Sequence, residues 1–269
     1  MVRMGRRSMR RRIAGVMLTA SILLLGISGY FLADLFLQER KDDVLWEQLK
    51  EIYENDDTEE AGETPMESED NENGEPTSSA VHPGLLALHG ENPDCIGWLR
   101  IDGTVIDYPV MYHPEEENYY LHRDFCGEYS ANGCLFLSEL CNPGMSDNLI
   151  IYGHHMNSGK MFATLDQYKN IEFYREHPLI SYNTLQGEEI YQVFAVFCTP
   201  VYTENDFPYY TFTKAEDAAE YQGYIEAVKE RSLYDTGITA VFGDKLLTLS
   251  TCEYSQRNGR IVVAAKKIR

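Results

Sequence analysis

The sequence of 269 residues is poor in positive charge and lacks the motifs of several common functional classes. Its 23 Lys and Arg stand against 43 Asp and Glu, a formal net charge of −20 at pH 7. A partner nucleic acid is therefore not expected, because phosphate recognition needs a basic surface. The sequence has no C-x-x-C pair, which argues against a thiol redox protein. It also has no glycine-rich phosphate loop, no regular βαβ alternation and no internal repeat, so we expect neither a nucleotide-binding α/β fold nor a solenoid.

The charge that is present is unevenly distributed along the chain. Residues 1–41 carry a net charge of about +6, residues 42–80 about −14 and residues 81–269 about −12. These differences predict regions with different roles. We expect a cytoplasmic basic segment over residues 1–12, a transmembrane anchor over 13–36, a juxtamembrane helix and acidic spacer over 37–80, and one extracellular folded domain over 81–269.

The N-terminal segment has the pattern of a membrane anchor. Six Arg within the first twelve residues precede an uncharged run of 21 residues, Ile13–Ala33. As a helix this run spans roughly 30 Å, the thickness of the hydrocarbon core of a bilayer. Positive charge stays inside, so the sequence predicts a single-pass protein of the cell membrane with a cytoplasmic N-terminus. A cleaved signal peptide is the alternative, although this run is longer than a usual signal core and lacks a clear cleavage site. In both interpretations the rest of the chain is exported from the cytoplasm.

A short helix and a spacer are expected to follow the anchor. Residues 44–53 place Leu45, Leu49 and Ile52 at helical spacing, which predicts an amphipathic helix. Residues 54–80 have almost no apolar side chains and many acids. Such a segment buries too little surface to offset the entropy of ordering it, so we expect a disordered, self-repelling tether.

The region from residue 81 onward is rich in β-branched and aromatic runs separated by turn signals, which predicts a mainly β fold. Few helices interrupt these runs. A short helix is predicted over Met161–Tyr168, and a longer one, introduced by a capping box at Thr213 and Glu216, is predicted to end near Arg231. Seven or eight strands with few helices indicate a closed or nearly closed β-barrel. The predicted strands are 96–101, 105–111, 134–140, 148–152, 189–197, 245–251 and 260–268.

Cys252 differs from the other five cysteines in its position along the chain. It ends an apolar run, and Arg260 begins the next one after a polar loop. If the two runs pair as a hairpin, the thiol and the guanidinium face each other at the rim of the sheet. A guanidinium stabilises a thiolate and is a fixed donor for a developing oxyanion. A rim cysteine beside an incidental arginine is the alternative.

The other cysteines give weaker signals. Cys95 and Cys198 lie in apolar runs and are expected to be buried hydrophobic residues. One disulfide among Cys126, Cys134 and Cys141 is an open alternative outside the cell. Their spacing does not match a zinc site.

A cysteine nucleophile needs a general acid–base group, most often histidine. His154 and His155 follow another apolar run, so they too are expected at the end of a strand. The remaining histidines lie in polar stretches and are expected to be solvated. Neither the papain-type nor the caspase-type cysteine signature is present.

The chain resembles the sortases, the cysteine transpeptidases of Gram-positive cell surfaces. The resemblance is carried, in chain order, by Tyr152-Gly153-His154, by the pentapeptide Thr248–Cys252, and by Arg260 at the start of a valine-rich run. Further segments resemble class B sortases over roughly residues 85–269. They are Asn92-Pro93-Asp94, Gly97-Trp98-Leu99, Ile106–Val110, Tyr119-Tyr120-Leu121, Tyr152–Met156 and the helix near 214–231.

The resemblance implies a fold and an activity. The expected fold is an eight-stranded sortase-like β-barrel with an N-terminal helix and a long helix inserted between late strands. Cys252 is expected to attack the carbonyl of a Thr in a C-terminal sorting signal, with Arg260 holding the oxyanion and His154 moving the protons. Ser250 and Tyr152 match positions that line the substrate groove. His155 is the alternative acid–base residue. No metal or other cofactor is expected, because the nucleophile and the oxyanion donor are both side chains.

The implied partners are surface proteins that bear a sorting signal, and an acceptor amine of peptidoglycan, lipid II or a pilin. Three alternatives stay open on the sequence. The thioester could pass to water, which would make the protein a thiol-dependent sorting-signal hydrolase. The domain could be a non-enzymatic extracellular binding module with an incidental thiol. If the chain is a sortase, both a housekeeping role and a role in pilin polymerisation are compatible with these residues.

Overall fold

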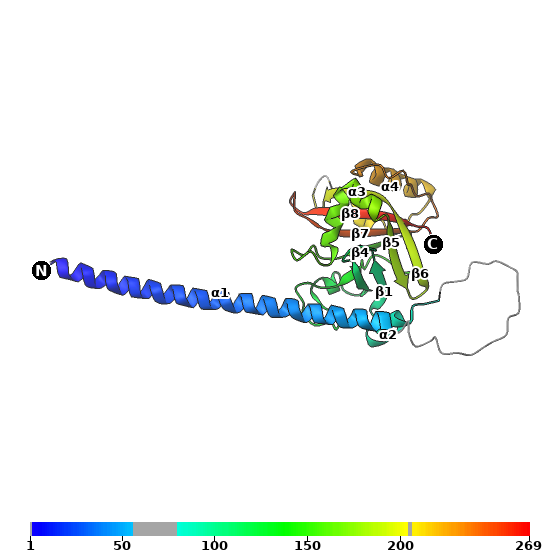
Figure 1. The fold of residues 1–269 in the computed structure, drawn as a ribbon. Helices are drawn as coiled ribbons and strands as arrows, with labels where there is room; N and C mark the ends of the chain where they lie inside the picture. The colour runs from blue at the N-terminus through cyan, green and yellow to red at the C-terminus, as the bar shows by residue number, and fades with distance from the viewer. Residues whose placement is uncertain (1, 56–79, 204–205) are drawn as a thin grey trace, which may run out of the picture. The chain divides into compact units, whose positions relative to one another are not determined.

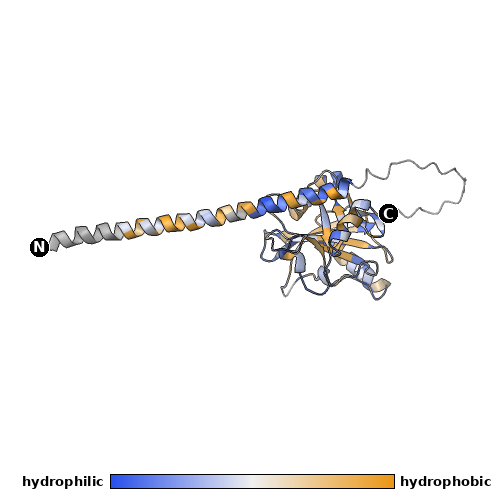
Figure 2. Cartoon of the chain, turned by 90° about the horizontal axis from the view of Figure 1, so that it is seen from below, coloured by the Kyte–Doolittle hydropathy of each residue, from blue (hydrophilic) through white to orange (hydrophobic). Residues whose placement is uncertain are grey.

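The computed structural model describes residues 2–55, 80–203 and 206–269. The chain divides into two compact units, one up to Leu45 and one over Trp46–Arg269. The long N-terminal helix α1 (Val2–Asn55) contains a stretch from Gly15 onward that is long and apolar enough to cross a membrane. Figure 2 shows these apolar residues giving way to hydrophilic ones further along α1. Most of the spacer expected over 54–80 lies outside the described residues.

The second unit is an eight-stranded closed barrel, as expected (Figure 1). Around the barrel the strands follow the order β1, β2, β3, β4, β7, β8, β6, β5. Two neighbouring pairs, β2 with β3 and β4 with β7, are parallel, and the other pairs are antiparallel. The strands are β1 (Cys95–Arg100), β2 (Asp107–Met111), β3 (Leu135–Leu137), β4 (Asn148–Tyr152), β5 (Leu179–Thr184), β6 (Gly187–Pro200), β7 (Leu246–Glu253) and β8 (Gly259–Lys267).

The sequence pattern did not predict strand β5. β5 reads Leu-Ile-Ser-Tyr-Asn-Thr, and only its alternate residues, Ile180, Tyr182 and Thr184, are buried. Such a half-polar strand lacks the continuous apolar run that marks the others. It pairs with β6 through a tight connection that ends at Gly187, whose φ of 120° favours glycine. With β5 in place, the barrel closes between β1 and β5.

The inserted helix between β6 and β7 is α4 (Ala218–Arg231), and it begins later than the sequence predicted. The capping box expected at Thr213 and Glu216 is wrong. Asp217 caps the helix instead, because its Oδ1 accepts hydrogen bonds from the backbone nitrogens of Ala219 and Glu220, each at 2.9 Å. The other helical segments are α2 (Pro83–Glu91), η1 (Tyr119–His122), η2 (Phe162–Lys169), α3 (Ile171–Glu176) and η3 (Tyr209–Thr211).

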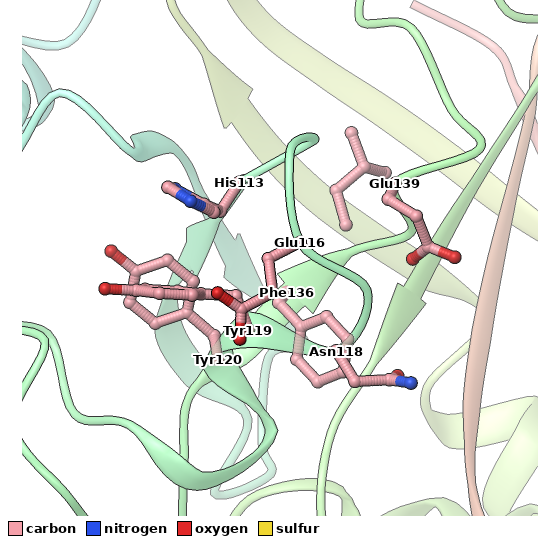
Figure 3. A pocket seen from close by; sticks show the side chains of 8 residues that line it. His113, Glu116, Asn118, Tyr119, Tyr120, Phe136 and Glu139 are labelled. Atoms are coloured by element: carbon pink, nitrogen blue, oxygen red, sulfur yellow. The ribbon is translucent and has the colours of Figure 1, made fainter.

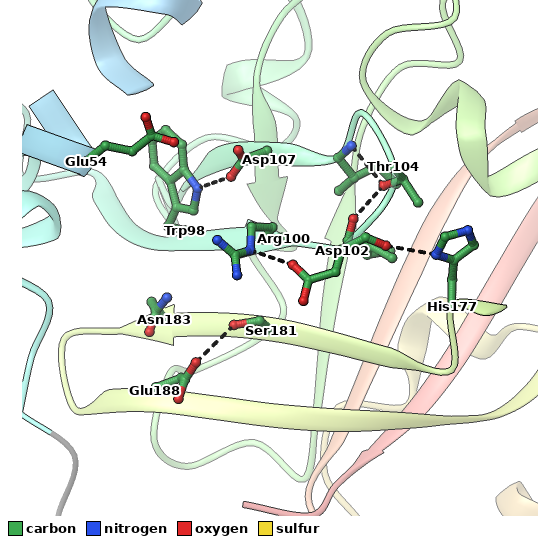
Figure 4. A network of polar contacts seen from close by, with 12 residues as sticks. Glu54, Trp98, Arg100, Asp102, Thr104, Asp107, His177, Ser181, Asn183 and Glu188 are labelled. Carbon is green, nitrogen blue, oxygen red and sulfur yellow. Dashed lines mark hydrogen bonds and ion pairs between the residues drawn. The ribbon is translucent and has the colours of Figure 1, made fainter. Parts of the chain in front are cut away.

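The end of α1 within the second unit packs on the barrel. The Tyr53 ring stacks on Trp98 at 4.1 Å and on His82 at 4.0 Å, and its hydroxyl accepts a hydrogen bond from Asn183 at 2.7 Å. Trp98 in turn donates its indole N–H to Asp107 at 2.7 Å (Figure 4). Within residues 46–55, Leu49 and Tyr53 are buried and Trp46 packs against the hydrophobic core of the barrel unit.

The turn between β1 and β2 is held by polar contacts (Figure 4). Thr104 donates its hydroxyl to the carbonyl of Ile101 at 2.8 Å, and the backbone N–H of Ile106 donates to that hydroxyl at 3.1 Å. The His177 ring nitrogen Nδ1 lies 2.8 Å from the carbonyl of Asp102, and it donates there because a carbonyl only accepts. The turn is therefore tied to the chain just before β5.

Candidate active site

The β7–β8 hairpin places the candidate nucleophile beside the candidate oxyanion donor. Cys252 and Arg260 are directly paired in the antiparallel register of the two strands. Directly opposed residues of an antiparallel pair point to the same face, with their Cβ atoms about 5 Å apart. Ser250, two residues before Cys252, shares that face because side chains alternate along a strand. The hairpin predicted from the sequence is thus confirmed, with this pairing.

The neighbouring strand β4 brings the candidate acid–base residue to the same rim. β4 runs parallel to β7, with Tyr152 in register with Ser250. The Thr251 hydroxyl donates to the carbonyl of Gly153 at 2.7 Å, which ties the end of β4 to β7. A Cβ at Gly153 would collide with the buried side chains of Leu135 and Phe162, so a larger residue directly before His154 would force them to shift.

The His154 ring is held in one orientation by a backbone carbonyl. Its Nε2 lies 2.8 Å from the carbonyl of Leu121 in η1, so Nε2 carries the proton. Nδ1 makes no hydrogen bond to any residue that the structure describes, which leaves its lone pair available. Burial lowers the pKa of His154, and the nearby His122 ring, 5.5 Å away between centroids, lowers it further, while the bond to Leu121 opposes both effects. The imidazole is therefore neutral at pH 7.

A groove of about 560 Å³ joins these side chains. All five residues predicted as catalytic or substrate-binding line it: Cys252, His154, Arg260, Ser250 and Tyr152. His155 does not line the groove, although it directly follows His154 in the chain. Apart from Gly153 after β4 and Thr251 of β7, the remaining lining residues come from the segment around η1, from β3 and the turn after it, and from the connection that carries η3. They are Glu117, Asn118, Leu121, Phe136, Ser138, Glu139, Leu140, Gly153, Val201, Tyr202, Tyr209, Tyr210, Thr211 and Thr251.

Sequence reasoning missed Tyr209. Its hydroxyl lies 2.7 Å from the Ser250 hydroxyl, and both side chains are buried. Burial raises the pKa of Tyr209 to about 12, against lowering contributions from the Ser250 hydrogen bond and the charge of Arg260. The tyrosine therefore stays neutral and fixes the Ser250 hydroxyl in the groove. The aromatic run from Phe207 to Phe212 was the available signal, but nothing in it indicates which strand it packs against.

A second, smaller pocket shares Asn118, Phe136 and Glu139 with the groove and is lined by His113 and Tyr120 (Figure 3). The Tyr120 hydroxyl donates to Asp94 at 2.9 Å, and Nδ1 of His113 lies 2.9 Å from the same carboxylate. Asn92 donates to the carbonyl of Phe125 at 2.6 Å. This network fixes the segment whose Leu121 carbonyl orients His154.

Glu253 follows Cys252 but points away from the groove. Its side chain is only 3% exposed and forms an ion pair with Lys169 of η2 at 2.7 Å. Burial alone would raise the pKa of this carboxyl, but the hydrogen bonds from Lys169 and from Ser255 outweigh it and lower the pKa. Glu253 therefore remains ionised and anchors the start of the β7–β8 loop to η2.

The other sequence expectations about cysteines are partly met. Cys95 is fully buried, and burial raises the pKa of its thiol to about 12, so it behaves as the hydrophobic residue expected. Cys198 is only half-buried. Of the three neighbours considered for a disulfide, Cys141 is a free thiol that hydrogen-bonds to the carbonyl of Asn148 at 3.5 Å. Among the described residues, no three His, Cys, Asp or Glu side chains gather to hold a metal ion.

A closed barrel whose rim brings thiol, imidazole and guanidinium to one groove defines a cysteine-dependent acyl-transfer enzyme. The sortase domain model matches residues 99–268, well over half of the chain. The chain belongs to the sortase family, a family of cysteine transpeptidases that process sorting signals.

Individual relatives agree with the class B resemblance. The chain is 33% identical to sortase B of Listeria monocytogenes over 255 residues, covering 92% of this chain and 95% of the relative. It is 29% identical to sortase B of Staphylococcus aureus, covering 92% and 93%. Among solved structures, a Staphylococcus aureus sortase B–substrate complex superposes with a TM-score of 0.72 at 27% identity, covering 87% of this chain and 99% of that one.

Proposed function

We propose that Cys252, His154 and Arg260 are the catalytic residues of this sortase. The single observation that carries the proposal is that all three line one groove, from three different positions in the chain. Cys252 is the nucleophile, Arg260 the oxyanion donor and His154 the group that moves protons.

The first half-reaction cleaves the sorting signal. The thiol of Cys252 gives its proton to the free Nδ1 of His154, and the sulfur attacks the carbonyl carbon of the Thr. The guanidinium of Arg260 stabilises the oxyanion that forms on the carbonyl oxygen. As the oxyanion collapses, the carbon–nitrogen bond breaks, and the imidazolium of His154 gives its proton to the leaving nitrogen. A thioester on Cys252 and a released amine remain.

The second half-reaction transfers the acyl group. A neutral amine of peptidoglycan, lipid II or a pilin attacks the thioester carbonyl, and His154 takes a proton from the attacking nitrogen. The carbon–sulfur bond breaks, and the sulfur of Cys252 recovers the proton from His154. The product is a surface protein joined through an amide bond to the cell wall or to another subunit.

Two further groove residues are assigned to substrate binding. Ser250 lies two residues before Cys252 on the same face of β7, and Tyr152 is its register partner on β4. The hydroxyl of Ser250 is fixed by Tyr209 at 2.7 Å. Together they form the floor of the groove on which the peptide segment before the scissile bond rests.

The N-terminal helix anchors this enzyme at its site of action. An apolar stretch that begins at Gly15 follows the arginine-rich start of the chain. We assign it as a single membrane span with a cytoplasmic N-terminus and an extracellular catalytic domain. The acidic residues between 54 and 80 then form a tether, and tethering raises the effective concentration of the enzyme near substrates at the same surface.

The test uses the full chain in detergent micelles and a peptide library of the form Asn-Pro-x-Thr-Asn, with and without triglycine as amine. Mass spectrometry of the products is expected to show cleavage after Thr, and a ligated product when the amine is present. Cys252→Ala, His154→Ala and Arg260→Ala should each lose nearly all turnover, because residues that act as one unit are not additive. Cys198→Ala, a cysteine outside the groove, is the matched control. Hydrolysis that persists unchanged at high amine concentration would instead identify a hydrolase, and turnover by Cys252→Ala would refute the assignment.

A further inference from the structure

His155 makes contacts that its neighbour His154 does not. Its Nδ1 lies 3.0 Å from the carbonyl oxygen of Cys252. Its ring meets the ring of Tyr254 edge to face, with 5.1 Å between centroids. The Tyr254 hydroxyl lies 3.4 Å from the carbonyl of His155, at the long end of hydrogen-bond distance. The side chain is half-buried between the chain leaving β4 and the chain leaving β7.

This contact lies where the pairing of β4 with β7 has ended. The last register pair of the two parallel strands is Tyr152 with Ser250. One residue further, the hydroxyl of Thr251 still holds the carbonyl of Gly153 at 2.7 Å. The next residues along each strand are His154 and Cys252. The imidazole of His155 thus continues the link between the strands at the point where the reacting side chains leave them.

We propose that His155 is a positioning residue of the sortase reaction, whose Nδ1–H holds the Cys252 carbonyl and so fixes the thiol against His154. The proposal rests on the catalytic roles proposed above for Cys252 and His154. It gives His155 a role different from the acid–base alternative, because its ring faces a backbone carbonyl and does not line the groove. Loss of the contact should act on kcat, since small misplacements of reacting groups cost up to about 100-fold in rate.

The contact requires a particular tautomer. A carbonyl oxygen only accepts, so the nitrogen of His155 that faces Cys252 carries the proton. Its neutral form is therefore Nδ1–H. His154 is held as the opposite tautomer, Nε2–H, by the carbonyl of Leu121. Two adjacent histidines with opposite tautomers are a signature that a merely space-filling His155 would not produce.

The kinetic test compares His155→Asn, His155→Gln and His155→Leu in the full chain in detergent micelles. The side-chain nitrogen of Asn is two bonds from Cβ, as Nδ1 is, whereas that of Gln is one bond further away and Leu has no donor. With Asn-Pro-x-Thr-Asn peptides as probe, we expect His155→Leu and His155→Gln to lose at least about tenfold in kcat with KM within about twofold of the wild type. His155→Asn should keep kcat within about threefold, since the donor is retained.

Two readouts need no turnover. Histidine ¹⁵N spectra of the wild-type chain above pH 8 should show the Nδ1–H form at His155 and the Nε2–H form at His154. Alkylation of Cys252 by iodoacetamide, resolved from that of the exposed Cys126 by peptide mass mapping, should be slowed by His155→Leu and preserved by His155→Asn. An Nε2–H form at His155, or a His155→Leu variant with wild-type kcat and wild-type alkylation, overturns the proposal. His155→Asn as impaired as His155→Leu also overturns it, because the donor would then be irrelevant.

The outcomes separate this proposal from the proposed function. Turnover that survives Cys252→Ala contradicts the catalytic assignment, and the tautomer and alkylation readouts still decide whether His155 holds the Cys252 backbone. Turnover that survives His154→Ala but not His155→Asn would make His155 the acid–base residue, and both proposals would fail. Wild-type turnover that is abolished by Cys252→Ala and unaffected by His155→Leu would leave the catalytic assignment intact and refute only the positioning role.

Discussion

Cys252 and Arg260 are directly opposed on β7 and β8, so the thiol and the guanidinium leave the barrel rim from the same point of one hairpin. The ladder of backbone hydrogen bonds between β7 and β8 fixes the separation of Cys252 and Arg260. The polar loop that joins the two strands therefore does not determine it. Residues placed on regular strands are held more rigidly than residues placed on loops, and this rigidity is what a preorganised oxyanion donor requires.

Replacing Arg260 with Lys tests whether the planar guanidinium is needed, since the charge is kept. Lys is a point charge on a flexible stem and cannot present two parallel donors. We expect kcat/KM for Asn-Pro-x-Thr-Asn peptides to fall by about 100-fold, the usual effect of losing one oxyanion donor. Arg257→Lys, in the exposed part of the same loop, is the matched control and should leave kcat/KM unchanged. A wild-type rate for Arg260→Lys would show that charge alone is sufficient.

The pairing of Cys252 with Arg260 was predictable from the sequence because two apolar runs joined by a short polar loop form a hairpin with few alternative registers. The position of His154 at the same rim was predictable only in part. The apolar run before it indicated the end of a strand, but not that β4 lies parallel to β7. That adjacency is a long-range choice of the barrel, and the family resemblance supplied it.

Contacts between residues that lie far apart in the chain could not be predicted. The carbonyl that orients His154 belongs to Leu121, and nothing about a leucine in the sequence indicates that role. Tyr209 reaches Ser250 from a connection 41 residues away in the chain.

The start of α4 was misplaced for a local reason. Thr213 and Asp217 are each followed three residues later by a glutamate, so both match the pattern of a helix cap, and only the structure shows that Asp217 is the cap.

The Tyr209–Ser250 hydrogen bond should give a measurable coupling free energy in a double-mutant cycle. Ser250→Ala leaves the buried Tyr209 hydroxyl without this partner and should lower the free energy of unfolding by about 1–3 kcal/mol. Tyr209→Phe removes the other member of the pair. The double variant should be less destabilised than the sum of the two single variants, with a coupling of at least about 0.5 kcal/mol. Denaturant unfolding of all four proteins measures this cycle, and strict additivity would mean that the two hydroxyls do not interact.

Burial is the main cause of the lowered pKa of His154, and the His122 ring adds to it, so removing that ring should raise the pKa. The electrostatic effect of the His122 ring opposes protonation of the neighbouring His154 imidazole. In His122→Gln this effect is lost, and the acidic limb of the kcat/KM profile should move to higher pH. NMR titration of His154 checks the shift directly. His177→Gln, in the contact to Asp102 shown in Figure 4, is the control and should leave His154 unaffected.

The lowered pKa of His154 also predicts how stability changes with pH. Between the lowered pKa and the ordinary value of 6.5, the unfolded chain binds more protons at this position than the folded chain. The contribution of His154 to stability therefore falls as the pH decreases below about 6.5. His154→Gln should flatten this part of the stability profile, and a slope that is unchanged would assign the effect to other groups.

The Lys169–Glu253 ion pair should stabilise the end of β7. Lys169→Met leaves the buried Glu253 carboxylate with only its Ser255 partners, and we expect a loss of about 1–3 kcal/mol in the free energy of unfolding at pH 7. Because the pKa of Glu253 is lowered, this stabilisation is present above about pH 4.5 and is lost as the pH falls through the lowered pKa. The wild type and the variant should therefore converge in acid. Arg175→Met breaks an exposed pair with Glu172 and should cost less than about 1 kcal/mol.

The last turn of α1 should contribute to the stability of the barrel unit, although the sequence placed the folded domain from residue 81 onward. Tyr53 is 7% exposed, stacks on Trp98 and His82, and accepts a hydrogen bond from Asn183. Tyr53→Ala removes a buried aromatic ring and should lower the free energy of unfolding by about 3 kcal/mol. Tyr129→Ala, at a residue that is 68% exposed, is the control and should change the free energy of unfolding by less than about 0.5 kcal/mol.

The contacts of Tyr53 with Trp98, His82 and Asn183 also predict that a fragment beginning at residue 46 melts at a higher temperature than one beginning at residue 81. Equal melting temperatures for the two fragments would mean that the stacked tyrosine adds nothing to the barrel.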